Sequence, residues 1–304
     1  MRIFLTGATG YIGGSVAAAL IAKGHEVQGL VRSDARAAQA RGAGIEPIVG
    51  SLDDADILTD AARAADAVIN TANADHGPSA DAIIAALAGS NKKFLHTSGS
   101  SIVGHPDGGE LSENVFDETT EFVPSAGRAA RVDINNRVLA GADNGVHAVI
   151  ICPSLIYGLG SGVSKHSMQV PWLIDLAREL GVAKHIGSGA NTWSNVHIDD
   201  LVDLYLLALD KAPAGAFYFA ENGENSMREV CEAISKMLGF GGGTEPMTAE
   251  FAATHWGEGP AHNTMASNSR VRAMRARSEL GWSPHAPSLI EEIETGIYAT
   301  NYPA

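Results

Sequence analysis

The sequence predicts an α/β fold, with a doubly wound parallel sheet in the first half and a smaller C-terminal cap. Three observations predict this class. Short β-branched or apolar runs alternate with alanine-rich helical stretches, which is the pattern of consecutive βαβ units. A glycine-rich segment follows the first apolar run directly. The length of 304 residues suits one large domain with a smaller lobe better than two equal domains.

The strands of the first half are predicted from their apolar runs, and the helices between them from their alanine content. Gly24 and Gly89 follow two of these helices and are expected to end them. Right-handed crossovers then place helices on both faces of the sheet. Strands are expected at Ile3–Leu5, Glu26–Val31, Ile45–Val49, Ala67–Asn70, Phe94–Thr97 and Ala148–Cys152, and helices at Tyr11–Lys23, Ala55–Ala64, Pro78–Leu87 and Gly127–Ala142.

The segment Thr6–Gly13 reads TGATGYIG and lies between the first predicted strand and the first predicted helix. In this position Gly7 permits a tight turn, Gly10 lets the backbone approach a pyrophosphate, and Gly13 lets the helix pack closely on the strand. The free N–H groups and the positive dipole end of the helix also favour a phosphate. The segment therefore predicts a Rossmann-like dinucleotide site.

The end of the second strand favours NADP(H) over NAD(H). A carboxylate normally holds the ribose 2′-hydroxyl at this place, but here the chain reads Leu30-Val31-Arg32-Ser33. Arg32 is expected to pair with a 2′-phosphate, and Ser33 to add a hydrogen-bond donor. NADP(H) is the predicted cofactor and NAD(H) the second candidate; the alternative for Arg32 is a solvated side chain.

The second half of the chain is expected to form mainly the cap. Glycine, serine and proline are frequent at 153–166, 240–245 and 257–260, where loops are expected. We predict an NAD(P)-binding Rossmann domain over 1–155, to which segments near 190–220 return, and a substrate-binding cap over 156–304. Strands at His185–Gly187 and Ala216–Phe219, with helices at Val170–Leu180, Met227–Leu238 and Leu289–Tyr298, are expected to complete the cap.

Composition and charge exclude several classes of partner. A formal net charge of −14 repels nucleic acid and anionic lipid, so neither is expected to bind. Cys152 and Cys231 lie in apolar or helical runs and predict buried thiols without a disulfide framework. No metal-ligand spacing occurs, so no metal is predicted. The chain begins directly with a strand and has no apolar run long enough to cross a bilayer, from which we expect a cytoplasmic protein.

Four motifs together resemble the extended short-chain dehydrogenase/reductase superfamily, which includes sugar-nucleotide epimerases, dihydroflavonol reductases and related aldehyde reductases. They are Thr6–Gly13, Cys152–Gly158, Trp193–Asp200 and Glu279–Pro284. The resemblance runs from Arg2 to about Pro284. It implies contacts of Ser51 and Leu52 with the adenine, of Thr71, Ala72 and Asn73 with the middle of the cofactor, and of Pro153 and Leu155 with the nicotinamide side. The complete set of expected cofactor residues is Gly7, Thr9, Gly10, Tyr11, Ile12, Gly13, Arg32, Ser33, Leu52, Thr71, Ala72, Asn73, Thr97, Pro153 and Leu155.

The proton-transferring dyad of this superfamily is absent. Members that transfer hydride usually carry a Tyr, and a Lys four residues later, on the helix before the sixth strand. Counting back from Val149–Cys152 puts this pair at Arg128 and Val132, and no nearby register restores it. Arg128 can orient or neutralise an anion, but it cannot donate a proton near neutrality.

Three other side chains are candidates for catalysis. Ser98 and Ser100 follow the fifth strand, at the edge of the sheet where ligands bind, and either can hydrogen-bond a substrate carbonyl; a turn-forming role is the alternative. His76, on the loop after the fourth strand, is a candidate proton donor. The Arg131-x-Asp133 pattern is a further candidate, with a salt bridge on the helix surface as the alternative.

The sequence thus predicts an NADP(H)-dependent oxidoreductase that acts on a small carbonyl or alcohol substrate with a non-standard proton donor. Two alternatives remain open at this stage: a nucleotide-sugar epimerase or dehydratase, and a non-enzymatic redox sensor that binds NADP(H). The resemblance also implies a homodimer packed through the alanine-rich segments Ala80–Ala88 and Ala126–Ala142.

Overall fold

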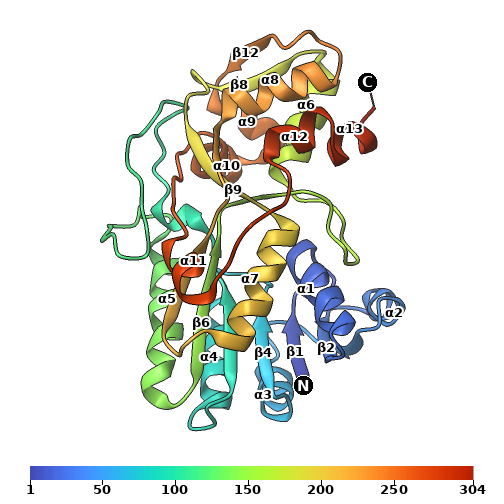
Figure 1. The fold of residues 1–304 in the computed structure, drawn as a ribbon, viewed down its shortest axis with the longest axis vertical. Coiled ribbons are helices and arrows are strands. Elements are labelled where there is room, and N and C mark those ends of the chain that lie inside the picture. The colour runs from blue at the N-terminus through green and yellow to red at the C-terminus, as the bar shows by residue number, and fades with distance from the viewer. Residues whose placement is uncertain (304) are drawn as a thin grey trace.

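The computed structural model describes residues 1–303 and contains a seven-stranded parallel sheet below a smaller cap (Figure 1). The order in the sheet is β10-β6-β5-β4-β1-β2-β3. From β1 the chain first adds β2 and β3 on one side and then adds β4, β5, β6 and β10 on the other, so the strand order reverses between β1 and β4. Ligands bind outside the carboxyl ends of the strands at such a reversal. The predicted Rossmann-like fold is confirmed. The strands are β1 (Arg2–Thr6), β2 (Glu26–Val31), β3 (Glu46–Val49), β4 (Ala67–Asn70), β5 (Lys93–Thr97), β6 (His147–Pro153) and β10 (Ala216–Ala220).

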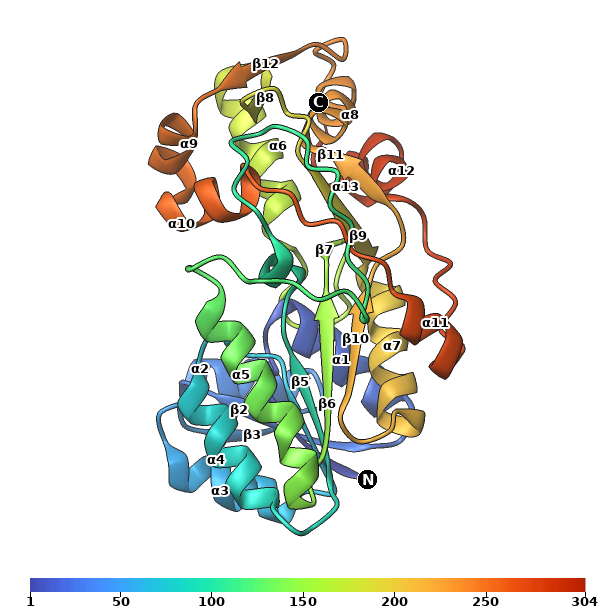
Figure 2. The same cartoon turned by 90° about the vertical axis from the view of Figure 1, so that its left-hand side faces the viewer.

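Helices cover both faces of the sheet (Figure 2). On one face α1 (Tyr11–Ala22) packs against α7 (Ile198–Lys211), and on the other α3 (Ala55–Ala64), α4 (Gly77–Leu87) and α5 (Ala129–Ala140) lie side by side. Apolar side chains of the central strands, such as Phe4 and Phe94, are fully buried between these layers.

Helices α2 (Asp34–Gly42) and α7 were not predicted from the sequence. α2 buries only Ala37 and Ala40, so it has almost no apolar stripe to reveal it. α7 does carry such a stripe, because Leu201, Leu204, Tyr205 and Ala208 are buried at helical spacing. The signal for α7 was therefore present in the sequence.

The cap lies beyond the carboxyl ends of the strands and has its own apolar core, which includes Leu173, Ile234 and Tyr298. β7, β9 and β11 form one small sheet, and β8 pairs with β12 in another. The cap elements are β7 (Leu155–Tyr157), α6 (Gln169–Leu180), β8 (Ala183–Ile186), β9 (Thr192–His197), β11 (Glu224–Ser226), α8 (Met227–Met237), β12 (Thr244–Met247), α9 (Ala249–Trp256), α10 (Glu258–Pro260), α12 (Leu289–Glu294) and α13 (Ile297–Asn301), while α11 (Met274–Leu280) packs beside β10 and α7.

Two expectations about the second half are wrong. The strand expected at Ala216–Phe219 does not complete the cap: β10 pairs with β6 at the edge of the main sheet, within the segment near 190–220 that was expected to return to the Rossmann domain. The predicted helix Leu289–Tyr298 is broken into α12 and α13. The break occurs because the Glu292 carboxylate folds back and accepts a hydrogen bond from the Ile297 N–H (2.8 Å), and it lies so close to Gly296 that a Cβ there would be 2.5 Å from Glu292 Oε2.

No helix among residues 1–303 combines the length and the apolar character needed to cross a bilayer. Cys152 and Cys231 are buried free thiols, as expected.

Candidate functional site

The glycine-rich turn between β1 and α1 is shaped by close backbone contacts. Gly7 has φ +72°, a conformation that favours glycine. A Cβ on Gly13 would lie 2.3 Å from Gly7 O and from Thr71 Oγ1, so only glycine lets α1 pack this closely on β1 and the loop after β4. At Gly10, by contrast, the only protein atom near a Cβ would be Gly7 O, at 3.1 Å. The outer side of Gly10 is therefore left open for a ligand.

The first turn of α1 offers unpaired N–H groups to that open side. Gly10 is the N-cap residue, no side chain caps the helix, and the first turn contains no acidic residue. Free N–H groups at the positive end of a helix are well suited to bind a pyrophosphate. The cradle thus fits the phosphates of a dinucleotide.

A cleft of about 640 Å³ opens at this turn, between the carboxyl ends of β1, β2 and β4. Its volume lies within the range of small-molecule and cofactor sites, roughly 300–1,000 Å³. The cleft brings together many of the predicted cofactor residues. Its walls are Gly7, Thr9, Gly10, Leu30, Val31, Arg32, Arg36, Ser51, Leu52, Asp53, Thr71, Ala72, Asn73, His76 and Ser164.

Two arginines line the β2 end of the cleft. Arg32 is joined there by Arg36, which sequence reasoning missed, and neither forms an ion pair within residues 1–303. The Ser33 hydroxyl oxygen accepts a hydrogen bond from the Arg36 N–H (3.3 Å) and so caps α2. Ser33 is not part of the cleft wall. Its hydroxyl caps α2, however, and so holds in place the first turn of α2, from which Arg36 reaches the cleft.

Several other predicted cofactor residues are not part of this cleft wall. Thr97 Oγ1 hydrogen-bonds to the Tyr205 hydroxyl of α7 (2.5 Å), because alternate side chains of β5 point to opposite faces of the sheet. The Leu155 side chain is buried in the core of the cap. Pro153 is buried where β6 pairs with β10, and Ile12 packs on the main core.

A strap formed by Gly158–Ser164 lies across the glycine-rich turn. The Tyr11 hydroxyl donates to Gly158 O (2.9 Å), and the Ser164 hydroxyl donates to Thr9 O (2.8 Å). The Ser161 N–H donates to Ser15 Oγ (3.2 Å), and a Cβ on Gly162 would lie 2.2 Å from the Gly14 carbonyl carbon. Ser164 thereby becomes part of the cleft wall. The glycine spacing of this segment, GLGSG, was the sequence signal for a close backbone approach.

His76 lies in the cleft wall with both ring nitrogens engaged. Its Nδ1 accepts a hydrogen bond from the Ser79 N–H (3.2 Å), which caps α4. Its Nε2 lies 3.1 Å from Asp53 Oδ1 and therefore carries the ring proton in the neutral imidazole. These contacts hold the ring beside Asp53 and Leu52, on the β3 side of the cleft.

Ser98 and Ser100 lie in different surroundings from His76, at the end of β5. Asn135 Nδ2 of α5 donates to Ser98 Oγ (2.9 Å). Ser100 is only 1% exposed, and its hydroxyl pairs with that of Ser269 (2.8 Å). The structure therefore does not bring the three predicted catalytic side chains together.

A cluster of Asp75, Ser101 and Arg131 lies at the same edge of the sheet. Arg131 donates two hydrogen bonds to the Asp75 carboxylate (2.7 and 2.5 Å) and one to Ser101 Oγ (3.2 Å). The hydrogen bonds from Arg131 hold the pKa of Asp75 below its ordinary value. Asp133, the other member of the Arg-x-Asp pattern, instead pairs with Arg137 on the helix surface. Sequence reasoning did not select Ser101, because only the fold shows that Arg131 reaches it.

Buried polar side chains of β1, β4 and β5 form a series of hydrogen bonds next to this edge of the sheet. Asn70 hydrogen-bonds to His96 Nδ1 (3.0 Å), and the Thr6 hydroxyl donates to Asn70 Oδ1. Burial, with a smaller contribution from Arg131, lowers the pKa of His96 to about 4. The imidazole is therefore neutral at physiological pH.

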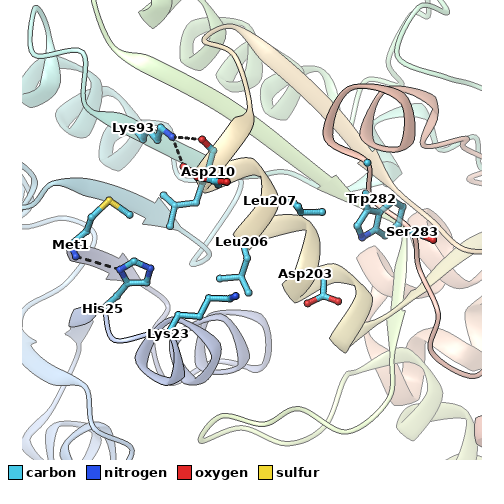
Figure 3. Close-up of a pocket in the computed structure, with 12 residues that line it drawn as sticks. Met1, Lys23, His25, Lys93, Asp203, Leu206, Leu207, Asp210, Trp282 and Ser283 are labelled. Carbon is cyan, nitrogen blue, oxygen red and sulfur yellow. Dashed lines mark hydrogen bonds between the residues drawn. The ribbon is translucent and has the colours of Figure 1, made fainter.

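A second cleft, of about 810 Å³, opens at the opposite end of the sheet (Figure 3). Met1, Lys23 and His25 line one side of it, and α7 contributes Leu206 and Asp203 to the other. Parallel sheets bind their ligands at the carboxyl ends of the strands, whereas these residues lie near the amino ends. This larger cleft is therefore not the cofactor cleft.

Comparison with known proteins agrees with this geometry. The chain matches the NAD dependent epimerase/dehydratase family over residues 3–218. It is 31% identical to the oxidase UcsJ of an Acremonium species, over 96% of this chain and 95% of that protein. It is 30% identical to a 2-alkyl-3-oxoalkanoate reductase of Stenotrophomonas maltophilia, over 79% of this chain and 76% of that protein.

Solved structures give the same fold. The dTDP-glucose 4,6-dehydratase of Bacillus anthracis in complex with NAD is similar at a TM-score of 0.78 and 16% identity, over 99% of this chain and 96% of that chain. The glycine-rich turn, the sheet order and the family match agree, and the chain therefore belongs to the NAD dependent epimerase/dehydratase family within the extended short-chain dehydrogenase/reductase superfamily.

Proposed function

We propose that this enzyme is an NADP(H)-dependent oxidoreductase that acts on a small carbonyl or alcohol substrate. The observation that carries the cofactor preference is the pair Arg32 and Arg36 in the cleft wall, with no ion pair to either and no acid at the end of β2. Two guanidinium groups without an ion-pair partner suit a 2′-phosphate, since Arg36 donates only to the neutral Gln39 Oε1 (3.1 Å). The ribose 2′-hydroxyl of NAD would lack its usual carboxylate partner. The related 2-alkyl-3-oxoalkanoate reductase supports a carbonyl substrate.

The residues present fit the adenine, the pyrophosphate and the middle of the cofactor. The backbone of Gly7–Gly13 and the start of α1 would hold the pyrophosphate, Leu52 would pack on the adenine, and Thr71, Ala72 and Asn73 line the middle of the cleft. When bound, the cofactor would supply hydride-transfer chemistry to a carbonyl or alcohol carbon.

The proton for the carbonyl oxygen must come from a group other than the usual tyrosine. We propose Ser101, whose Oγ accepts a hydrogen bond from Arg131 while its own proton has no acceptor within residues 1–303. The neighbouring guanidinium stabilises the negative charge that develops on Ser101 Oγ as the proton leaves. Solvent then returns a proton to Ser101. His76 and Ser100 are engaged in structural hydrogen bonds. Ser98 Oγ accepts its hydrogen bond from the neutral amide of Asn135 and not from a guanidinium, and we propose Ser98 only as a group that orients the substrate.

Transfer of deuterium tests the proposal without knowledge of the substrate. The protein is incubated with NADPH carrying deuterium at the transferable ring position, in a cell metabolite extract, and products are searched for the label by mass spectrometry. A labelled metabolite that forms about a hundredfold more slowly with Ser101→Ala is the expected result. Intact NADPH binding with no transfer of label would overturn the oxidoreductase function.

The second candidate function is a nucleotide-sugar epimerase or dehydratase. It is favoured by the fold shared with the dTDP-glucose dehydratase. Such a reaction oxidises and then reduces one substrate on a tightly held cofactor, which requires a base that the chain lacks at Arg128 and Val132. Purified protein that carries bound NAD in stoichiometric amount would favour this function over ours.

A further inference from the structure

The start of α5 holds an excess of positive charge. Arg131 is neutralised by Asp75, with which it shares two hydrogen bonds. Arg128, one helical turn earlier, is partly buried and forms neither an ion pair nor a side-chain hydrogen bond within residues 1–303. The positive charges of Arg128 and Arg131 are therefore balanced by only one nearby negative charge, that of Asp75.

Three effects disfavour the charge on Arg128. Burial lowers its pKa first and the neighbouring Arg131 lowers it further, while the Asp75 carboxylate acts in the opposite direction. Arg128 is also the N-cap residue of a helix of twelve residues, so it stands at the positive end of the helix dipole, where anions are favoured and cations are not. A partly buried cation without a partner is costly, and a partner anion from outside the chain removes that cost.

The position of this charge links it to the reaction. Arg131 touches the turn after β5, where a Cβ on Gly99 would lie 3.3 Å from its Nη1. Asp75 belongs to the same loop as Asn73, which lines the cofactor cleft. Arg128 is the N-cap residue of α5, one turn before Arg131, and Arg131 donates a hydrogen bond to the proposed proton donor Ser101. Arg128 therefore lies at the same end of α5 as the residue that contacts Ser101.

We infer that Arg128 binds a carboxylate on the substrate, so that the substrate is an oxo acid or the corresponding hydroxy acid. This inference rests on the proposed function, and it adds the class of substrate. The planar guanidinium matches a carboxylate with two parallel hydrogen bonds. The carboxylate neutralises the surplus charge at the start of α5, while the carbonyl of the same molecule lies toward Ser101.

Binding of a simple anion tests the inference separately from catalysis. Benzoate and its neutral analogue benzamide are titrated by calorimetry into the protein loaded with NADP⁺. Benzoate is expected to bind more tightly than benzamide. The Arg128→Gln substitution is expected to lower the affinity for benzoate on the order of tenfold or more and to leave the affinity for benzamide unchanged. Arg137→Gln removes the same charge from the surface of the same helix, where Arg137 pairs with Asp81, and should change neither.

Turnover supplies the second readout. Oxidation of NADPH is followed with acetoacetate and with its methyl ester, for the wild type, Arg128→Gln and Arg128→Lys. The acid should be preferred, the glutamine variant should raise KM for the acid alone, and the lysine variant should restore part of the loss.

The outcomes separate the two proposals. No oxidation of NADPH, together with benzoate binding that depends on Arg128, would count against acetoacetate reduction and still support the carboxylate site. Equal affinity of benzoate for the wild type and Arg128→Gln would overturn the carboxylate site. Loss of NADP⁺ affinity in Arg128→Gln would also overturn it, because Arg128 would then belong to the cofactor site.

Discussion

Arg32 and Arg36 form the cationic end of the cofactor cleft, and together they should decide which cofactor is bound. The double variant Arg32→Ala/Arg36→Ala is expected to lower the affinity for NADPH about ten- to a hundredfold, since hydrogen bonds to charged groups contribute about 1.5–3 kcal/mol. NADH should lose little affinity, because it carries no 2′-phosphate. Fluorescence titration of both cofactors measures the difference, and Arg41→Ala in the last turn of α2 is the matched control. Equal losses for the two cofactors would contradict the assignment.

His96 predicts a dependence of stability on pH. Its folded pKa of about 4 lies below the ordinary 6.5, so the unfolded chain binds more protons between these values. Stability should therefore be complete above pH 6.5 and fall as the pH is lowered through this window, by about 2 kcal/mol from this group at pH 5. Urea unfolding at pH 5 and pH 7 measures the change. His96→Gln should show a smaller difference between the two pH values, and an unchanged difference would assign the effect to other groups.

The sequence located cleft residues whose position depends on local geometry, and it missed those whose position depends on the fold. Gly7, Gly10 and Gly13 could be assigned from their place between a strand and a helix, and Arg32 from its place at the end of β2. Arg36 required knowledge that α2 begins at once after Arg32. Ser101, Asp75 and Ser164 meet their partners through contacts between segments far apart in the chain, and no local pattern encodes such contacts.

The strap Gly158–Ser164 is the element that ties the cap to the glycine-rich turn, and Gly162 is its closest point of contact with α1. Gly162→Ala should force the strap and helix apart and lower the free energy of unfolding by about 1–3 kcal/mol. The substitution should also lower the affinity for NADPH, because Ser164 would leave the cleft wall. Thermal unfolding and cofactor titration report the two effects. Gly243→Ala, at a glycine with open space around it, should change neither.

Among the secondary structure elements, the strands of the main sheet were predicted well and those of the cap poorly. The main strands are buried apolar runs, a signal that lies within each segment. The cap strands are short, and their partners lie far away: β9 pairs with β7 and β11, and β8 pairs with β12. Their residues alone do not reveal these pairings, which depend on how loops bring the segments together.

For the molecule as a whole, we expect a homodimer joined through α4 and α5. These helices lie side by side on one face of the sheet, held together by the ion pair of Arg137 with Asp81, and they expose Ala85, Ala88 and Ala140. Small side chains allow two such helix pairs to approach closely. Ala85→Arg should convert the dimer to a monomer, as measured by light scattering after gel filtration. A wild-type protein that is monomeric at high concentration would exclude this dimer.

The strap also has a consequence for the order in which the protein is built. The Gly158 carbonyl accepts a hydrogen bond from the Tyr11 hydroxyl of α1, and the Gly158 N–H donates to the Tyr298 hydroxyl of α13 (3.1 Å). Tyr11 leaves the ribosome well before Tyr298, because the two residues lie far apart in the chain. The nucleotide site therefore acquires its full set of neighbours only after α13 has been made, and contacts between such distant parts of a chain are slow to form. A nascent chain released before α13 is made should bind nucleotide more weakly than a chain that contains α13, although every residue of the glycine-rich turn is already present.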